Sequence, residues 1–219
     1  MTHWTIEQRC STVDALLARA PVLPVISISK LEDAVPLARA LVAGGLPVLE
    51  VTLRSAIALE AIAAMVRAVP GAIVGAGTVL DEDDLDAVTR AGALFSISPG
   101  STESVYLAAA RATIPHIPAI ASASELMRGL EHGHRRFKFF PAESSGGVGA
   151  LKAFAGPFPQ VQFCPTGGID AASAPRYLAL DNVITVGGSW MVPIAALAAR
   201  DFARIEALAK EAVRLNQPA

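Results

Sequence analysis

Lys138 is the residue of this sequence best placed to do chemistry, because it interrupts the apolar run Phe137-Lys138-Phe139-Phe140. Side chains alternate across a strand, so Phe137 and Phe139 face one way and Lys138 faces the other. Large apolar side chains suit the layer beneath covering helices, which directs Lys138 away from that layer. Burial disfavours the ammonium form and leaves an amine that can attack a carbonyl carbon. The alternative is a lysine at a frayed strand end that extends into water.

Glu50 is the second candidate, since a carboxylate inside Val48-Leu49-Glu50-Val51 is costly to bury without a partner. With Lys138 or Arg54 as that partner, Glu50 would form a structural ion pair. Alternatively, Glu50 is a general acid and base that moves protons through a water molecule. The two interpretations are compatible, because a base beside a reactive lysine also holds that lysine in place.

Two glycine-containing turns, Gly167-Gly168 and Gly187-Gly188-Ser189, indicate a phosphate site. Glycine lets the backbone approach an anion, while the N–H groups of a following helix and the Ser189 hydroxyl can donate to it. Either turn alone is equally consistent with a helix stop. Arg54 could grip a substrate carboxylate with its planar guanidinium group, and Thr78 could add a hydroxyl donor. A solvated surface arginine is the alternative for Arg54.

Short β-rich runs that alternate with alanine- and leucine-rich helical stretches must position these residues. Strands are expected at 25–28, 48–52, 73–76, 94–97, 116–118, 136–140, 162–164 and 183–186, after a leading helix within residues 1–20. Such alternation forces parallel strands and predicts an α/β fold, a single (β/α)8 TIM barrel with an N-terminal helix that fills residues 1–219 as one domain. The rival is a doubly wound open sheet, but no glycine-rich dinucleotide turn follows the first run.

A barrel places active sites at the carboxyl ends of its strands, and phosphate often binds after the seventh and eighth. Lys138, Glu50, Arg54, Thr78 and the two glycine turns all fall at such ends. The predicted fold therefore gathers every candidate residue at one edge of the sheet.

Composition and charge narrow the functional class. The formal net charge of −2 gives no electrostatic footprint for nucleic acid or a membrane surface. Mean hydropathy is +0.46, but every apolar stretch is broken before a membrane-spanning length, and the first residues lack a signal-peptide pattern. Cys10 and Cys164 are expected to be reduced thiols of a cytoplasmic protein. His132 and His134 are expected to face water, and the histidines predict no metal site.

Seven ordered strings carry a resemblance that runs from about residue 21 to 193. They are Leu-Val-Ala-Gly-Gly at 41–45, Leu-Glu-Val-Thr-Leu-Arg at 49–54, Val-Gly-Ala-Gly-Thr-Val-Leu at 74–80, Ile-Ser-Pro-Gly at 97–100, Phe-Lys-Phe-Phe-Pro-Ala-Glu at 137–143, Cys-Pro-Thr-Gly-Gly-Ile at 164–169 and Gly-Gly-Ser-Trp at 187–190. Through them the chain resembles the class I aldolases that cleave 2-keto-3-deoxy-6-phosphogluconate (KDPG) in the Entner–Doudoroff pathway.

The resemblance implies that Lys138 forms a Schiff base with the substrate and that Glu50 is the general acid and base. It also implies that Arg54 and Thr78 hold the substrate carboxylate. The other implied substrate-binding residues are Pro99 and Phe140 around the pyruvyl group, Thr166 beside the glycine turn, and Gly167, Gly168, Gly188 and Ser189 around the phosphate. A homotrimer, no metal or other cofactor, and a phosphorylated keto acid and pyruvate as partners are further implications.

Several alternatives stay open at this point. Within the same chemistry, the main substrate could be 4-hydroxy-2-oxoglutarate or the galactonate-derived epimer. Ser27, Ser29 and Ala119 depart from the family pattern, which leaves the stereochemical preference undecided. From other functional classes, the rivals are a phosphosugar isomerase with Glu50 as its base, and a protein that binds a phosphorylated ligand without catalysis.

Overall fold

Parallel strands alternate with helices throughout the computed structural model, which describes residues 4–216. The strands are β1 (Val22–Ile26), β2 (Val48–Thr52), β3 (Ile73–Gly77), β4 (Ser96–Ile97), β5 (His116–Ile117), β6 (Ala119–Ile120), β7 (Arg136–Phe139), β8 (Gln162–Pro165) and β9 (Val186–Gly188). The helices are α1 (Ile6–Leu17), α2 (Leu31–Ala43), α3 (Ala58–Ala68), α4 (Glu82–Arg90), α5 (Glu103–Arg111), α6 (Ala123–Glu131), α7 (Gly147–Ala155), α8 (Ala174–Leu178), α9 (Ile194–Ala198) and α10 (Phe202–Val213).

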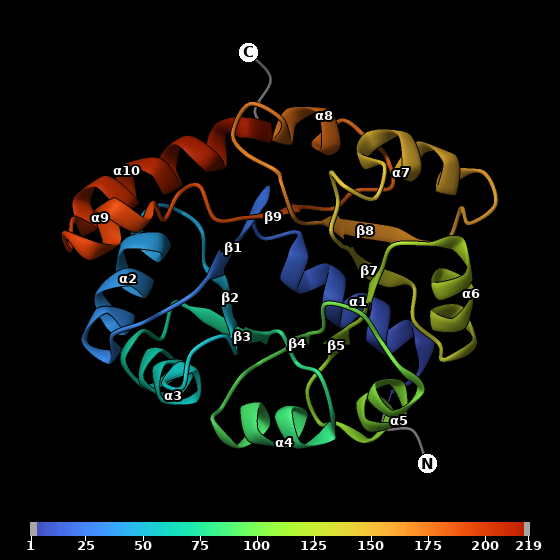
Figure 1. Cartoon of the computed structure of the whole chain (residues 1–219), viewed down its shortest axis with the longest axis horizontal. Coiled ribbons are helices and arrows are strands. Elements are labelled where there is room, and N and C mark those ends of the chain that lie inside the picture. The colour runs from blue at the N-terminus through green and yellow to red at the C-terminus, as the bar shows by residue number, and fades with distance from the viewer. Residues whose placement is uncertain (1–3, 217–219) are drawn as a thin grey trace.

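The strands form two ladders, in the orders β5-β4-β3-β2-β1-β9 and β6-β7-β8. Pro118 separates β5 from β6, and because proline has no N–H to donate, the predicted fifth strand is interrupted there. Figure 1 shows the sheet curled in the middle of the molecule with helices around its outside. The predicted α/β class is therefore confirmed.

The gap between β8 and β9 is spanned by two isolated bridges, Phe163 to Val183 and Thr166 to Gly187. Among residues 4–216 no continuous ladder joins these two strands. The hydrogen-bonding pattern therefore shows a curled parallel sheet but does not establish a fully closed eight-stranded barrel. The first and last strands overlap their predicted ranges but are shifted along the chain, to Val22–Ile26 and Val186–Gly188. In this register Val22 and Pro24 pair with Val186 and Gly188.

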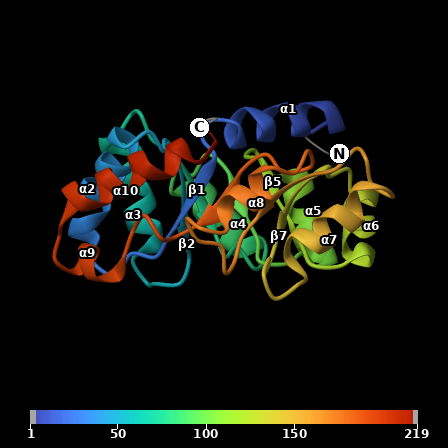
Figure 2. The ribbon, with the colours of Figure 1, turned by 90° about the horizontal axis from the view of Figure 1, so that it is seen from above.

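Helix α1 covers the end of the sheet at which the strands begin, and Figure 2 shows it lying apart from the ring of other helices. Its Val13 and Leu17 are buried in a cluster with Leu23, Val48, Phe95, Ile97, Ile117 and Cys164. A capping box at Thr5 and Gln8 begins the helix. The predicted leading helix is confirmed over Ile6–Leu17, whereas positions 1–3 of its predicted range lie outside the described residues.

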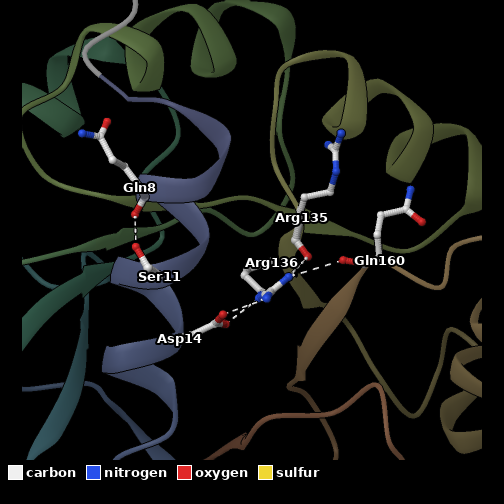
Figure 3. A network of polar contacts seen from close by, with 6 residues as sticks. All are labelled: Gln8, Ser11, Asp14, Arg135, Arg136 and Gln160. Carbon is white, nitrogen blue, oxygen red and sulfur yellow. Dashed lines mark hydrogen bonds and ion pairs between the residues drawn. The ribbon is translucent and has the colours of Figure 1, made fainter.

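Asp14 of α1 and Arg136 of β7 join this helix to the sheet. The guanidinium group donates to both carboxylate oxygens of Asp14, with 2.7 Å between Nη2 and Oδ2. Figure 3 shows Arg136 directed at Asp14, and its Nη1 also donates to the backbone carbonyl of Gln160. The hydrogen bonds to Asp14 raise the pKa of Arg136. A bidentate ion pair of this kind fixes the orientation of the two groups as well as their distance, so it holds α1 in one position on the sheet.

The main apolar core lies between the sheet and the surrounding helices. Phe137 and Phe139 are fully buried in it, as the alternation along the strand predicted. Phe139 meets Phe154 of α7 edge to face, with ring centroids 6.1 Å apart. Gly129 of α6 leaves room for Phe137, since an added Cβ would lie 2.3 Å from its ring. In the described part of the chain, no helix has the length and apolarity needed to cross a membrane.

Candidate active site

Lys138 and Glu50 meet across the inside of the curled sheet. The ammonium Nζ donates to Glu50 Oε1 over 2.8 Å, and the two side chains are only 7% and 1% exposed. The alternative of a lysine that extends into water is therefore wrong. Lys138 comes from β7 and Glu50 from β2, which are separated in the sheet, so the pair forms only because the sheet curls.

The second carboxylate oxygen of Glu50, Oε2, is buried and has no hydrogen-bond partner among the described residues. A buried acceptor without a partner costs about 1–3 kcal/mol, so its retention needs an explanation. The explanation we favour is that Oε2 is left free for a water molecule or a reactant group. Glu50 can then hold the lysine through Oε1 and exchange a proton through Oε2.

Gly77 of β3 makes the space that Glu50 occupies. An added Cβ at this position would lie 2.2 Å from Glu50 Oε1, and 2.7 Å from its Cγ. Gly77 was not among the residues selected from the sequence. The available signal was the Gly75-Ala76-Gly77 pattern, because glycine inside a strand often marks a close approach by another group.

Arg54 and Ser189 line one pocket of about 460 Å³ at the carboxyl ends of β1, β2 and β9. Arg54 is exposed, which both a ligand-binding arginine and a solvated surface arginine predict. The pocket wall also contains Ser27, Ser29 and Lys30 from the segment between β1 and α2. From the sequence, the two serines stood out only as departures from a family pattern, and Lys30 did not stand out.

Thr78 and Pro99 follow β3 and β4 at the same edge of the sheet. Both are partly buried, and Thr78 has a φ of 64°. A β-branched residue in the left-handed region is strained by about 1–3 kcal/mol, and such strain persists where the surrounding structure requires it. The strain points to a defined orientation of the Thr78 side chain. Neither residue lines the 460 Å³ pocket.

The two glycine turns are brought together by Thr166. This threonine bridges to Gly187, where an added Cβ would lie 2.1 Å from its Oγ1. Gly167 and Gly168 have φ values of 105° and 78°, which L side chains rarely adopt. The Gly168 N–H donates to no group within residues 4–216. These features leave backbone exposed to an approaching anion.

Helix termini lie at some distance from both glycine turns. Helix α8 begins at Ala174 and α9 begins at Ile194. The carboxylate of Asp170 also accepts the N–H groups of Ala172 and Ser173, so these donors are already occupied. Any anion at this edge would therefore meet the glycine turns and the Ser189 hydroxyl.

Phe140, directly after β7, lies close to Lys138, with 5.3 Å between Nζ and the ring centroid. A ring at this distance supplies an apolar wall and some stabilisation of a positive charge on the nitrogen. Cys164, in register with Lys138 on β8, is buried, and burial raises the pKa of its thiol to about 12. The thiol is therefore neutral and packs as an apolar side chain on the strand beside the lysine.

The histidines lie in a separate cluster. His134 is buried, so the expectation that it faces water is wrong; its Nε2 lies 2.7 Å from the Arg9 guanidinium of α1. Burial, with the charge of Arg9 as a second cause, lowers the pKa of His116 to about 3. Within the described residues, no three His, Cys, Asp or Glu side chains gather as a metal site requires.

A buried lysine in contact with a carboxylate inside a parallel α/β sheet is suited to an enzyme that processes carbonyl compounds through an amine. The sequence profile of KDPG and KHG aldolases matches residues 13–208. The chain belongs to this aldolase family.

Curated and solved relatives agree with the profile. The KHG/KDPG aldolase of Escherichia coli K12 is 58% identical over 203 residues, which cover 93% of this chain and 95% of the relative. The crystal structure of KDPG aldolase from Legionella pneumophila, with pyruvate captured at low pH as a covalent carbinolamine intermediate, superposes with a TM-score of 0.90. It is 48% identical, and the match covers 91% of this chain and 97% of that one.

A third relative carries a phosphorylated ligand. The KDPG aldolase of Zymomonas mobilis ZM4, solved with 3-phosphoglycerate, superposes with a TM-score of 0.89 at 50% identity. The match covers 94% of this chain and 97% of that one. The similarity therefore spans the whole region that contains the candidate active site.

Proposed function

We propose that this protein is a class I aldolase that cleaves KDPG into pyruvate and glyceraldehyde 3-phosphate through a Schiff base on Lys138. The observation that carries the proposal is the buried pair of Lys138 and Glu50, 2.8 Å apart, in a chain of the KDPG and KHG aldolase family. A carboxylate in contact with the lysine can take up the proton that the attacking amine must lose.

The reaction begins when Lys138 Nζ attacks the carbon-two ketone of the substrate and forms a carbinolamine. Loss of water gives an iminium ion, which accepts the electron pair of the breaking bond between carbons three and four. Glu50, acting from Oε2 through a water molecule, removes the proton of the carbon-four hydroxyl, and that oxygen becomes the aldehyde of glyceraldehyde 3-phosphate. Glu50 then returns the proton to carbon three of the remaining enamine, and hydrolysis releases pyruvate and the free lysine.

The substrate is oriented by groups on either side of this pair. Arg54 and Thr78 hold the carboxylate, and Pro99 and Phe140 enclose the pyruvyl carbons. Thr166 keeps the two glycine turns together, and the phosphate binds between them. The phosphate-binding residues are Gly167, Gly168, Gly188 and Ser189. The exposed Arg54 and the unpaired Gly168 N–H support this orientation.

Activity on 4-hydroxy-2-oxoglutarate is part of the proposal, because the family profile covers KHG aldolases and the Escherichia coli relative bears both substrate names. The closed eight-stranded barrel, as one domain over the chain, is proposed from the bridges between β8 and β9. The homotrimer and the place in the Entner–Doudoroff pathway stay predictions from the family resemblance. The cytoplasmic location stays a prediction from the two cysteines.

The test is to incubate the protein with pyruvate, reduce it with borohydride, and map the adduct by peptide mass spectrometry. A pyruvyl adduct on Lys138 is the expected result. The variant Lys138→Arg keeps the positive charge but lacks the primary amine, so it should form no adduct and lose at least about 10³-fold in cleavage rate. Appreciable cleavage by that variant would count against the Schiff-base role of Lys138. A folded wild type that forms no adduct would bring the isomerase and the binding protein forward.

A further inference from the structure

The loop after β7 packs directly on the turn that contains Gly167 and Gly168. The backbone N–H of Glu143 donates to the carbonyl of Gly167 over 3.1 Å, and that of Ala142 donates to Thr166 over 2.8 Å. An added Cβ on Gly168 would lie 2.9 Å from both Cβ and Cγ of Glu143. The side chain of Glu143 therefore lies over the turn, and the loop and the turn form one unit.

Tyr177 of α8 holds the far end of the Glu143 side chain. Its hydroxyl donates to Glu143 Oε1 over 2.6 Å, and the tyrosine is fully buried in the main core. Burial, and then the hydrogen bond to Glu143, raise the pKa of Tyr177, so the hydroxyl stays protonated and keeps donating. Arg176 adds only a 4.0 Å contact from a largely exposed side chain.

The Glu143 carboxylate is negatively charged and 42% exposed, and it lies beside a turn that is proposed to bind a phosphate. If the carboxylate turned toward that phosphate, the two like charges would repel each other. The Tyr177 hydroxyl fixes the carboxylate in one orientation from beneath. Neither residue was selected from the sequence, because the contact joins positions 34 residues apart on different elements.

We propose that Glu143 and Tyr177 are positioning residues of the phosphate subsite, which fix the Gly167–Gly168 turn and hold a carboxylate clear of the phosphate. The inference rests on the proposed function, since it deepens the role of the same turn. It concerns the phosphorylated end of the substrate and leaves the chemistry at Lys138 untouched.

The test is Tyr177→Phe, which removes one hydroxyl and keeps the ring. Loss of one hydrogen bond of this strength corresponds to about a three- to tenfold change in affinity. We expect KM for KDPG to rise by that factor while kcat stays unchanged. The pyruvate concentration that half-saturates borohydride trapping should not change, because pyruvate carries no phosphate. The dissociation constant of inorganic phosphate, measured by calorimetry, should rise by the same factor as KM.

One variant controls for structural damage. Tyr106→Phe removes the hydroxyl of the other tyrosine, which is buried on α5, and should leave KM for KDPG within twofold of the wild type. An equal rise for KDPG and pyruvate in Tyr177→Phe, or no rise at all, would overturn the inference. If the wild type cleaved no substrate, the proposed function would fail, and the phosphate affinities would still decide the role of Tyr177.

Discussion

Strand β7 carries two ion pairs on the same face. They differ in how far their side chains are buried and in whether both carboxylate oxygens have a hydrogen-bond partner. At its beginning, Arg136 binds both oxygens of Asp14, with side chains 16% and 37% exposed. Two residues later, Lys138 binds one oxygen of Glu50, with side chains 7% and 1% exposed, and the other oxygen has no partner within residues 4–216.

The difference separates an anchor from a reactive pair. In the bidentate pair near solvent, both carboxylate oxygens have a partner, and the pair joins a helix to a strand. A buried pair that leaves an acceptor unsatisfied adds little stability, because desolvation offsets the attraction between the charges. A buried acceptor left without a partner calls for an explanation, and a role in a reaction is one. The contrast supports the proposal that Lys138 takes part in the chemistry, whereas Arg136 anchors α1.

Glu50→Gln should break the reactive pair with the largest effect. The amide keeps the shape of the side chain but cannot take up a proton, and general acid–base catalysis contributes about 10²- to 10⁴-fold. We expect kcat for KDPG cleavage to fall by about that factor, measured with a coupled assay for glyceraldehyde 3-phosphate. Full kcat in this variant would exclude Glu50 as the acid and base.

Gly77→Ala should disturb the same pair without changing either charged group. The new methyl group would overlap Glu50 Oε1, so the carboxylate must leave its position against Lys138. Displacement by about 1 Å can cost up to about 10²-fold in rate. The matched control is Gly149→Ala in α7, where an added Cβ meets nothing within 4 Å. Equal kcat values for the two variants would show that Glu50 does not need this space.

Acid should weaken the end of the molecule where α1 lies. Burial lowers the pKa of His116 to about 3 and also lowers that of His134, so both stay neutral in the folded protein while the unfolded chain takes up protons near pH 6.5. The contribution of the two neutral histidines to the free energy of unfolding is fully present above pH 6.5. It is lost as pH falls toward 3, by up to about 1.4 kcal/mol per pH unit for each histidine.

The measurement is urea unfolding from pH 7.5 to 4.5 for the wild type and for His116→Gln. Removal of one titrating group should make the fall in the free energy of unfolding shallower. An identical pH dependence would mean that His116 also accepts its proton in the folded state.

Asp14→Asn should have the smallest effect, since it breaks the partly exposed pair. Such pairs contribute about 0.2–1 kcal/mol. We expect a small loss in the free energy of unfolding, partly masked at high salt, and an unchanged kcat. A drop in kcat as large as that of Glu50→Gln would erase the distinction between the two ends of β7.

The sequence itself determined the features of this protein that depend on residues close together in the chain. Alternation along a strand placed Phe137 and Phe139 in the core and Lys138 on the opposite face, because side-chain direction repeats every two residues. The alternation of strands and helices predicted the α/β class and gathered Arg54 and Ser189 at one edge. Motif strings spread over most of the chain predicted the family.

Only the tertiary structure decided which groups meet across long separations. Glu50 pairs with Lys138 rather than with Arg54, in a space that Gly77 leaves open. Tyr177 contacts Glu143, and His134 is buried beside Arg9. Each of these contacts joins residues from different elements. None leaves a periodic signal in its own segment. These contacts arise from the curl of the sheet and the seating of α1, which are set by the packing of the whole core rather than by any local pattern.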